Sequence, residues 1–405
     1  ADGNTDNLDT VADLQAKVAA ADNALAYIVS DVAVETGTDD AGTGTLTEQA
    51  QLDAYVDAGV LNVTADNLLA VNAQIRKQQA ADGNTDNLDT VADLQAKVVA
   101  ADNALAYIVS HVAVETGTDD AGTGTLTEQA QLDAYVDAGV LNVTADNLLA
   151  VNAQIRKQQA ADGNTDNLDT VADLQAKVAA ADNALAYIVS DVQVETFALD
   201  DVSGGEAVLT TTEQLAAYAD AGVRDVTEDN LLAVNAQLRL ETTAEDKDSV
   251  ADIHAIVGLA GAALDYLVDT VQANTTAPVS GATGSELLLA DQLAAYEAAG
   301  VRDVTADNLL AVNAQMRLET AAGNKDSVAD VQAIVALADA ALDYIVSTIA
   351  PLNSTAVTNA ATQLAAYSAA GITGVTVDNL LAVNAQIRKQ QAADGNTSNL
   401  DTVAD

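Results

Sequence analysis

Apolar residues recur at steps of three and four along the first long segment of the chain, between residues 11 and 32. The positions are Val11, Leu14, Val18, Ala21, Leu25, Ile28, Val29 and Val32. This spacing places them on one face of an α-helix, so the pattern predicts an amphipathic helix of about 25 residues. Thr10 followed by Asp13 has the spacing of a capping box, which favours a helix start at this point.

Two shorter helices follow in the pattern. The segment ETGTDDAGTGT interrupts the periodicity with glycine, threonine and aspartate, which are typical of a loop. A second helix is predicted from an N-cap at Thr47 to a stop at Gly59, and a third helix from an N-cap at Thr64. The apolar positions are Leu52, Tyr55 and Val56 in the second helix and Leu68, Val71 and Ile75 in the third.

This three-helix pattern repeats along the whole chain. Residues 1–80 and 81–160 differ at only two positions, Ala19 against Val99 and Asp31 against His111, and such a fixed period indicates tandem duplication. The third repeat is a hybrid, because its first half copies the earlier repeats and its second half resembles the later ones. The predicted boundaries are 1–80, 81–160, 161–243 (the hybrid), 244–321 and 322–392, with 393–405 starting a sixth repeat.

The fold class predicted from this pattern is all-α, a tandem array of about five three-helix-bundle repeats of about 75–83 residues each. Units of that size are large enough to fold alone or with modest help from their neighbours. Two columns of tyrosine, one on the long helices and one on the second helices, favour core or helix–helix packing. An asparagine recurs in every third helix, at Asn72 in the first repeat, and either points inward to fix the register or faces solvent.

Composition narrows the classes of partner. The chain carries 61 acidic and 15 basic residues, a formal net charge of −46, so nucleic acid and anionic membrane surfaces are poor partners because they repel a polyanion. No apolar run approaches the roughly 18 residues that a membrane span needs, which predicts no membrane insertion. Cysteine is absent, so neither disulfides nor thiolate metal sites are available.

The residues typical of catalysis are scarce, and we predict that the protein is not an enzyme. Only two histidines occur, His111 and His254, far apart in the sequence, and we interpret both as surface substitutions. No serine or threonine has a histidine or lysine partner that recurs with the repeat. Phosphate-loop, dinucleotide and nucleophile-elbow motifs are absent.

The segment DGNTDNLDTVAD, at 2–13, 82–93 and 162–173, is the candidate metal site. It joins the third helix of one repeat to the long helix of the next, and its oxygen-bearing residues have the spacing of an EF-hand calcium loop, most like the dockerin variant. The candidate Ca²⁺ ligands are Asp2, Asn4, Asp6, Leu8, Thr10 and Asp13 in the first copy, Asp82, Asn84, Asp86, Leu88, Thr90 and Asp93 in the second, and Asp162, Asn164, Asp166, Leu168, Thr170 and Asp173 in the third.

The same segment has a second interpretation as a polar turn that starts a helix. Asn7 stands where the calcium loop expects glycine, and Asp13 is shorter than the usual glutamate. The joints near 241–252 and 319–330 are four residues shorter and carry Lys247 and Lys325 at the seventh loop position, so we expect no calcium there. The repeat architecture therefore does not depend on the ion.

The recurring stretches AYxxAGVxxVTxDNLLAVNAQ and DxVADLQAxV resemble the helical repeat regions of giant bacterial surface and secreted proteins of the biofilm-associated adhesin type. This resemblance implies an extracellular location at the bacterial cell surface and a structural role as an acidic extender, or stalk, that folds with calcium after export. An alternative is a subunit that self-assembles into an extracellular filament, sheath or surface layer. The expected partners are neighbouring repeats of the same chain and, in the alternative, other copies.

Overall fold

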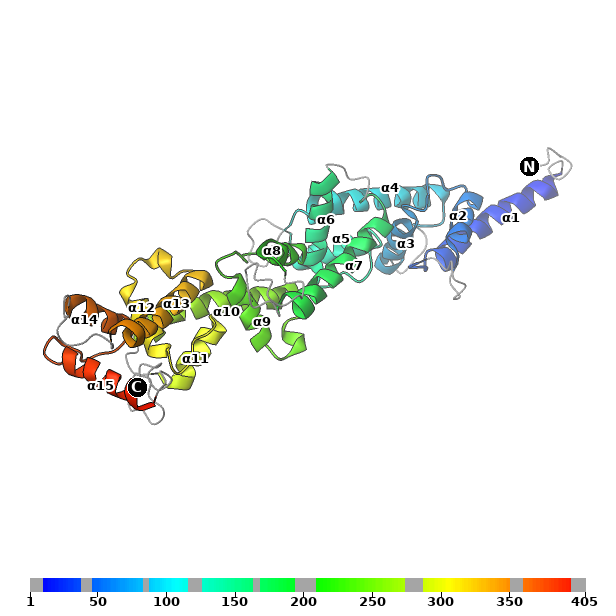
Figure 1. The fold of residues 1–405 in the computed structure, drawn as a ribbon. Coiled ribbons are helices and arrows are strands. Elements are labelled where there is room, and N and C mark those ends of the chain that lie inside the picture. The colour runs from blue at the N-terminus through cyan, green and yellow to red at the C-terminus, as the bar shows by residue number, and fades with distance from the viewer. Residues whose placement is uncertain are drawn as a thin grey trace. The chain divides into compact units, whose positions relative to one another are not determined.

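The computed structural model describes residues 10–37, 46–82, 87–115, 126–162, 168–193, 209–273, 287–349 and 360–394. Within these ranges every regular element is a helix and there is no strand, which confirms the all-α prediction (Figure 1).

The helices follow one another in the predicted order of long, second and third. The long helices are α1 (Val11–Tyr27), α4 (Val91–Tyr107), α7 (Val171–Tyr187), α10 (Val250–Asp269) and α13 (Val328–Tyr344). The second helices are α2 (Glu48–Asp57), α5 (Glu128–Asp137), α8 (Thr211–Asp220), α11 (Leu289–Ala298) and α14 (Ala360–Ala369). The third helices are α3 (Leu68–Asp82), α6 (Leu148–Asp162), α9 (Leu231–Leu240), α12 (Leu309–Leu318) and α15 (Leu380–Asp394).

Short helical turns extend or precede the long helices. A π-helical turn directly follows four of them, at η1 (Ile28–Val32), η2 (Ile108–Val112), η3 (Ile188–Val192) and η7 (Ile345–Ile349). In the fourth repeat α10 is longer and is followed by a 3₁₀ turn, η5 (Val271–Ala273), and two further 3₁₀ turns, η4 (Ala244–Asp246) and η6 (Ala322–Asn324), precede α10 and α13. The long helix of the first repeat thus runs from residue 11 to 32, a little shorter than predicted.

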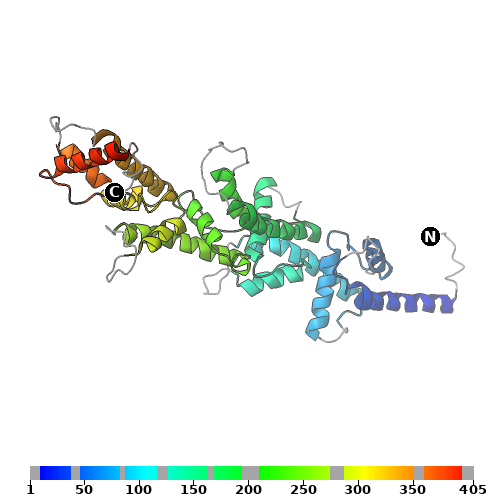
Figure 2. The ribbon, with the colours of Figure 1, turned by 60° about the horizontal axis from the view of Figure 1, so that its bottom comes forward.

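The chain divides into two compact units. The first comprises residues 1–186 with 219–223, and the second comprises 187–218 with 224–405. The division falls inside the hybrid third repeat, at the end of α7 and within α8. Figures 1 and 2 show the same succession of long, second and third helices in each unit.

Side-chain caps start the long helices as the sequence predicts. The Thr10 hydroxyl accepts a hydrogen bond from the backbone N–H of Asp13 at 3.1 Å, and the Asp13 carboxylate accepts one from the backbone N–H of Thr10 at 3.1 Å. The second repeat has the same capping box between Thr90 and Asp93. The reciprocal bonds satisfy amide groups that have no partner inside the helix, which fixes the helix start.

The second helix has the predicted ends. The Thr47 hydroxyl accepts a hydrogen bond from the N–H of Ala50, and α2 ends at Asp57. Gly59 follows with φ +78°, a left-handed conformation that glycine adopts without a steric penalty.

The third helix begins later than predicted. Thr64 is not its cap, because α3 starts at Leu68 and residues 64–67 form a turn. Asn67 holds this turn: its Oδ1 accepts a hydrogen bond from the N–H of Thr64 at 3.0 Å, and its Nδ2 donates to the carbonyl of Asn62 at 3.1 Å. The side chain of Asn67, and not that of Thr64, therefore stabilises the start of the third helix.

A buried polar network joins the second and third helices of each repeat. In the first repeat Tyr55 Oη donates to Asn72 Oδ1 at 2.6 Å, and Asn72 Nδ2 donates to Gln51 Oε1 at 2.9 Å. All three side chains are fully buried. The equivalent groups are Tyr135, Asn152 and Gln131; Tyr218, Asn235 and Gln214; Tyr296, Asn313 and Gln292; and Tyr367, Asn384 and Gln363.

The asparagine column therefore points inward, which resolves the two interpretations that the sequence left open. The tyrosines of the second helices are core residues, as predicted. The tyrosines of the long helices are not, since each is about 40% exposed; they are Tyr27, Tyr107, Tyr187, Tyr266 and Tyr344. A tyrosine covers a helix surface as readily as it fills a core, and spacing alone does not separate the two roles.

Burial of the core tyrosines predicts unfolding at alkaline pH. Desolvation raises the pKa of Tyr55 and its equivalents, to about 12 for Tyr367. The unfolded phenol ionises near pH 10. Because the folded pKa is higher, the stabilising contribution is complete below about pH 10 and is lost as pH rises through the folded pKa, at about 1.4 kcal/mol per pH unit for each tyrosine. We expect the urea midpoint to fall above pH 10. Complete tyrosinate absorbance with unchanged helix content would contradict this.

Two helical stretches, Val250–Ala273 and Val328–Thr348, are long and apolar enough to cross a membrane on length and composition. Core helices of soluble proteins meet the same criterion. In this chain both stretches bury one face, through Ile253, Val257 and Leu264 in the first and Val331, Val335 and Leu342 in the second.

Candidate functional site

The same set of contacts recurs at the junctions between consecutive repeats. Three long helices pack against the third helix of the repeat before them: α4 against α3, α10 against α9, and α13 against α12 (Figures 1 and 2). The second helix of the later repeat also reaches the same third helix, as α5 reaches α3. The helices that share an interface thus come from neighbouring repeats, and the repeats interlock.

Polar contacts lock the third helix to the end of the next second helix. Gln74 Nε2 donates to the backbone carbonyl of Asp137 at 2.7 Å, and the Lys77 ammonium forms an ion pair with the Asp137 carboxylate. Gln154 and Lys157 make the same two contacts with Asp220. The glutamine contact recurs from Gln237 to Ala298 and from Gln315 to Ala369. The carbonyls that accept these bonds lie at a helix C-terminus, where the helix itself supplies no donor.

The long helix contributes two further contacts. Gln95 bonds both backbone groups of Leu61, accepting from its N–H at 3.0 Å and donating to its carbonyl at 2.9 Å. Asn67 Nδ2 donates to Asp102 Oδ1 at 2.9 Å. The same pairs recur as Leu141 with Gln175, Arg302 with Gln332, Asn147 with Asp182, and Asn308 with Asp339.

The two histidines have different settings. His254 occupies the position equivalent to Gln95, and its Nε2 accepts a hydrogen bond from the N–H of Arg224 at 2.8 Å. It is therefore a partly exposed surface residue that also makes a contact across the junction, which the sequence did not predict. His111 is exposed and stacks on Tyr107 with ring centroids 4.9 Å apart, which confirms the surface interpretation there.

Glycine is required where the second helix meets the preceding third helix. Gly139 has φ +74°, and a Cβ placed on it would lie 2.6 Å from the carbonyl oxygen of Leu69. The same close approach occurs between Gly222 and Leu149, between Gly300 and Leu232, and between Gly371 and Leu310. Only glycine allows both the left-handed backbone and this separation.

One hydrogen bond in each unit spans two junctions. The N–H of Val171, at the start of α7, donates to the carbonyl of Asp66 at 3.2 Å, and the N–H of Val328, at the start of α13, donates to the carbonyl of Asp229 at 3.1 Å. Each pair joins a repeat to the second repeat after it. Such a hydrogen bond restricts how the first and third of three consecutive repeats can be oriented relative to one another.

The long joints contain the candidate calcium ligands. The structure places Asp82 and Asp162 at the ends of α3 and α6, and it buries the side chains of Leu88 and Leu168. Thr90 and Asp93 bond one another in the capping box, as do Thr170 and Asp173, and Thr10 and Asp13. The remaining candidates lie outside the described residues: Asp2, Asn4, Asp6, Leu8, Asn84, Asp86, Asn164 and Asp166.

Among the described residues, no three His, Cys, Asp or Glu side chains form a group that could hold a metal ion. Since most of the candidate ligands lie outside those residues, the calcium loop stays a prediction. The helix-starting role of Thr90 and Asp93 is confirmed, so an ion in this loop would share the Asp93 carboxylate with the cap.

The short joints hold a lysine in the place of the buried leucine. Lys325 is buried, and its ammonium donates to the carbonyl of Met316 at 3.1 Å and to Gln272 Oε1 at 3.3 Å. Lys247 Nζ likewise donates to the carbonyls of Leu238 at 3.1 Å and Glu241 at 2.9 Å. A cation at the C-terminal end of α9 or α12 is favoured by the helix dipole.

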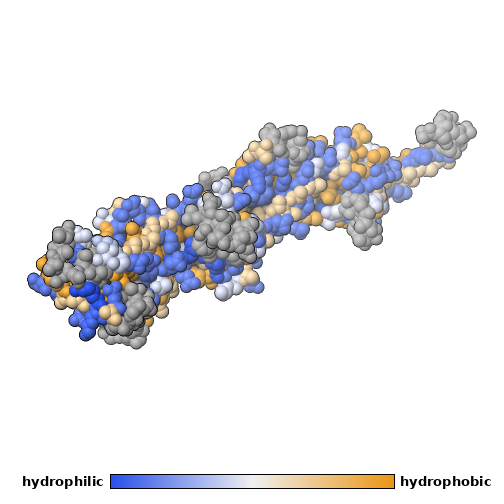
Figure 3. Space-filling view, in the orientation of Figure 1, coloured by the Kyte–Doolittle hydropathy of each residue, from blue (hydrophilic) through white to orange (hydrophobic). Residues whose placement is uncertain are grey.

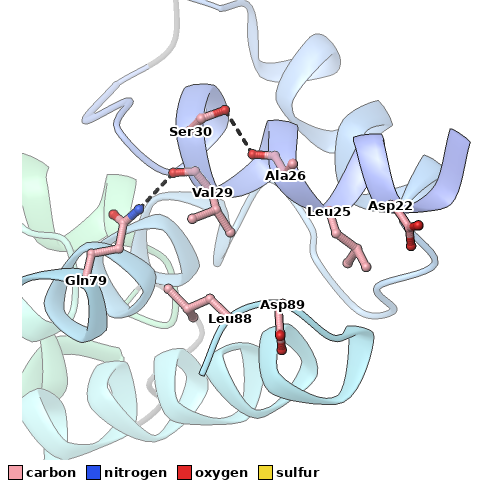
Figure 4. A pocket seen from close by; sticks show the side chains of 8 residues that line it. All are labelled: Asp22, Leu25, Ala26, Val29, Ser30, Gln79, Leu88 and Asp89. Atoms are coloured by element: carbon pink, nitrogen blue, oxygen red, sulfur yellow. Dashed lines mark hydrogen bonds between the residues drawn. The ribbon is translucent and has the colours of Figure 1, made fainter. Parts of the chain in front are cut away.

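A shallow groove lies beside each of the first two long joints. The first, of about 610 Å³, is lined by Leu25, Val29, Gln79 and Leu88, with Asp22, Ser30 and Asp89 at its edges. Figure 4 shows Val29 and Leu88 pointing toward one another, with Gln79 donating to the carbonyl of Val29 at 2.9 Å. The groove of the second joint has the equivalent lining from Leu105, Val109 and Leu168. Its walls are apolar and its edges carry carboxylates, without a histidine or lysine to move a proton.

Comparison with protein-family models, with curated proteins and with solved structures finds no match for this chain. The geometry of the junctions is therefore the main basis for a functional proposal. Sequence reasoning missed the junction residues Gln74, Lys77 and Gln95. The available signal was that these residues recur at the same position of successive repeats. That signal does not identify junction residues, because every exposed polar residue also recurs in a duplicated sequence.

Proposed function

We propose that this chain is a non-enzymatic structural repeat region that acts as an extender, or stalk, in a large bacterial surface protein of the adhesin type, outside the cell. In this proposal the chain is a tandem array of about five three-helix repeats. The observation that carries it is the junction: the same glutamine and glycine contacts recur at four successive junctions, with an asparagine–aspartate bond at three of them and a lysine–aspartate ion pair at two.

Interlocked junctions support an extender because they resist bending and separation. A flexible linker would leave successive repeats free to rotate, whereas each junction here buries helix faces from both repeats and adds hydrogen bonds across the boundary. The net charge of −46 also favours extension, since like charges along one chain repel.

A second candidate function is self-assembly into an extracellular filament, sheath or surface layer. One observation favours it: large apolar side chains are exposed inside the array, at Val56 and Val136 of the second helices and at Leu259 and Leu337 of the long helices. Calcium belongs to both candidates as a proposed ligand of the long joints. The lysines of the short joints support the expectation that those joints need no ion, because the ammonium already occupies the helix end.

Small-angle X-ray scattering on dilute full-length chain tests the extender and its calcium dependence together. A globular protein of this length has a radius of gyration of about 22 Å, and an extender should clearly exceed that value. If calcium binds the long joints and stiffens them, millimolar Ca²⁺ but not Mg²⁺ should narrow the distribution of the longest interatomic distances in the chain. A radius near 22 Å would contradict the extender function.

The double variant Asp82→Ala/Asp86→Ala should bind one Ca²⁺ fewer than the parent chain by equilibrium dialysis, because it removes two ligands of one loop. Asp246→Ala/Asp248→Ala in a short joint is the matched control and should leave the ion count unchanged. An unchanged count in the first variant would show that the loop assignment is wrong.

A further inference from the structure

One position just after each long helix varies with the type of joint that follows. It is the sixth residue after the exposed tyrosine of the long helix, and we call it the post-helix position. It holds alanine where the next joint is long and glutamine where the next joint is short. The alanines are Ala33, Ala113 and Ala350, and the glutamines are Gln193 and Gln272. Residues 161–196 are identical to residues 1–36 except at this position, so the single difference in that duplicated stretch accompanies the change of joint.

In the short joints the glutamine side chain links the long helix to the lysine of the joint. Gln193 Oε1 accepts a hydrogen bond from Lys247 Nζ at 3.3 Å, and Gln193 Nε2 donates to the backbone carbonyl of Val189. The Lys247 ammonium also reaches the carbonyl of Leu238 at 3.1 Å, near the end of α9. The contacts of the glutamine recur at Gln272, with Lys325 and Val268. One amide thus connects the end of a long helix to a cation that caps the third helix of the same repeat.

In the long joints the equivalent carbonyl receives its hydrogen bond from the third helix. Gln79 Nε2 of α3 donates to the carbonyl of Val29 at 2.9 Å (Figure 4). The same bond joins Gln159 and Val109 at 2.8 Å. Leu88 stands in the place of the lysine and is fully buried, as is Ala33 at the post-helix position. A glutamine at this position would bring an amide oxygen beside leucine, with no ammonium to bind it.

The backbone at the post-helix position is held in the same way in both types of joint. Arg76 of α3 donates to the carbonyl of Ala33 at 2.6 Å. Arg239 of α9 donates to the carbonyl of Gln193 at 2.5 Å. The surface does not separate the two types of joint either, since Figure 3 shows polar and apolar residues mixed over the visible face of both units. The two types therefore differ at this position in the side chain and not in the backbone contact.

We infer that the post-helix residue determines which type of joint a repeat can carry: glutamine belongs with the lysine of a short joint, and alanine with the leucine of a long joint. Each mismatch leaves a polar group with one hydrogen bond too few. Alanine opposite Lys325 would remove an oxygen from a buried ammonium, and glutamine opposite Leu88 would bury an amide oxygen without a donor. This pairing acts inside the chain, so the inference does not rest on the extender function.

Hydrogen–deuterium exchange of the full chain, followed by mass spectrometry in chelator, tests the pairing at one short joint. Gln193→Ala should speed exchange of the amides at 231–239, in α9, by about tenfold, because the Lys247 ammonium loses one of its hydrogen bonds. In a Lys247→Met background the same substitution should change that exchange by less than about threefold, since the partner is already absent. The amides at 309–317, in α12, are the internal control and should be unaffected. No effect in the parent chain, or equal effects in the two backgrounds, would overturn the pairing.

An exchange of joints gives a test in which the sign of the effect reverses. In a chimera, residues 240–249 are replaced by the sequence of residues 77–90, which turns the short joint into a long one. Gln193→Ala should now slow the exchange at 231–239 by about threefold or more, because the joint carries leucine instead of lysine. An effect of the same sign as in the parent chain would refute the inference, since a purely local role of Gln193 predicts faster exchange in both chains. A chimera with Gln193→Ala that leaves these amides unprotected would refute it as well.

Discussion

Replacing Gly139 with alanine should destabilise the chain by about 3–5 kcal/mol. Two costs combine at this position. The backbone has φ +74°, which costs an L-residue about 1–2 kcal/mol. The new Cβ would also lie 2.6 Å from the carbonyl oxygen and 2.9 Å from the carbonyl carbon of Leu69, so α5 must move away from α3. Equilibrium urea denaturation followed by circular dichroism measures the loss.

Gly59→Ala is the matched control for that variant. Its φ of +78° is nearly the same, but a Cβ there meets nothing within 4 Å. Only the conformational cost of about 1–2 kcal/mol remains. The difference between the two variants therefore measures the junction contact, and equal losses would show that the close approach of α5 to α3 does not contribute to stability.

Replacing Asn152 with leucine should cost about 2–5 kcal/mol, because a buried network loses its central member. Asn152 Oδ1 accepts from Tyr135 Oη at 2.6 Å, and its Nδ2 donates to Gln131 Oε1 at 2.8 Å. Leucine has a similar size but offers neither group, so the phenol and the amide each lose a buried hydrogen bond. The same urea titration measures the change.

The control for this variant is Asn103→Leu, at an exposed position of α4 in the same repeat. It should change stability by less than about 0.5 kcal/mol. If Asn152→Leu were equally mild, the network would be replaceable by apolar packing. Its recurrence in five repeats would then need another explanation, such as fixing the register of the second helix against the third.

The sequence predicted the helices because their periodicity and caps are local properties. Thr10, Asp13 and Thr47 act within a few residues of their partners, and the structure confirms each. The start of the third helix was wrong because Asn67 bonds two backbone groups in the preceding turn, an arrangement that competes with a threonine cap.

The partners of each helix could not be predicted, because identical repeats give identical patterns. Leu94, for example, is buried on α4, which packs against the third helix α3 of the preceding repeat. Periodicity gives the apolar face of a helix but not whether its own third helix or that of the preceding repeat covers it. For the candidate calcium loop, the turn and the ion require the same aspartates at the same spacing, so the two interpretations stay equivalent in sequence.

The uniformity of the junctions has a consequence for how such a chain varies between generations. Since third helices of identical sequence meet long helices of nearly identical sequence at successive boundaries, a crossover between misaligned gene copies inserts or removes whole repeats without creating a new interface. A polymorphic array gains or loses one junction per event, each with the same contacts. Length can then respond to selection while the interface residues stay unchanged.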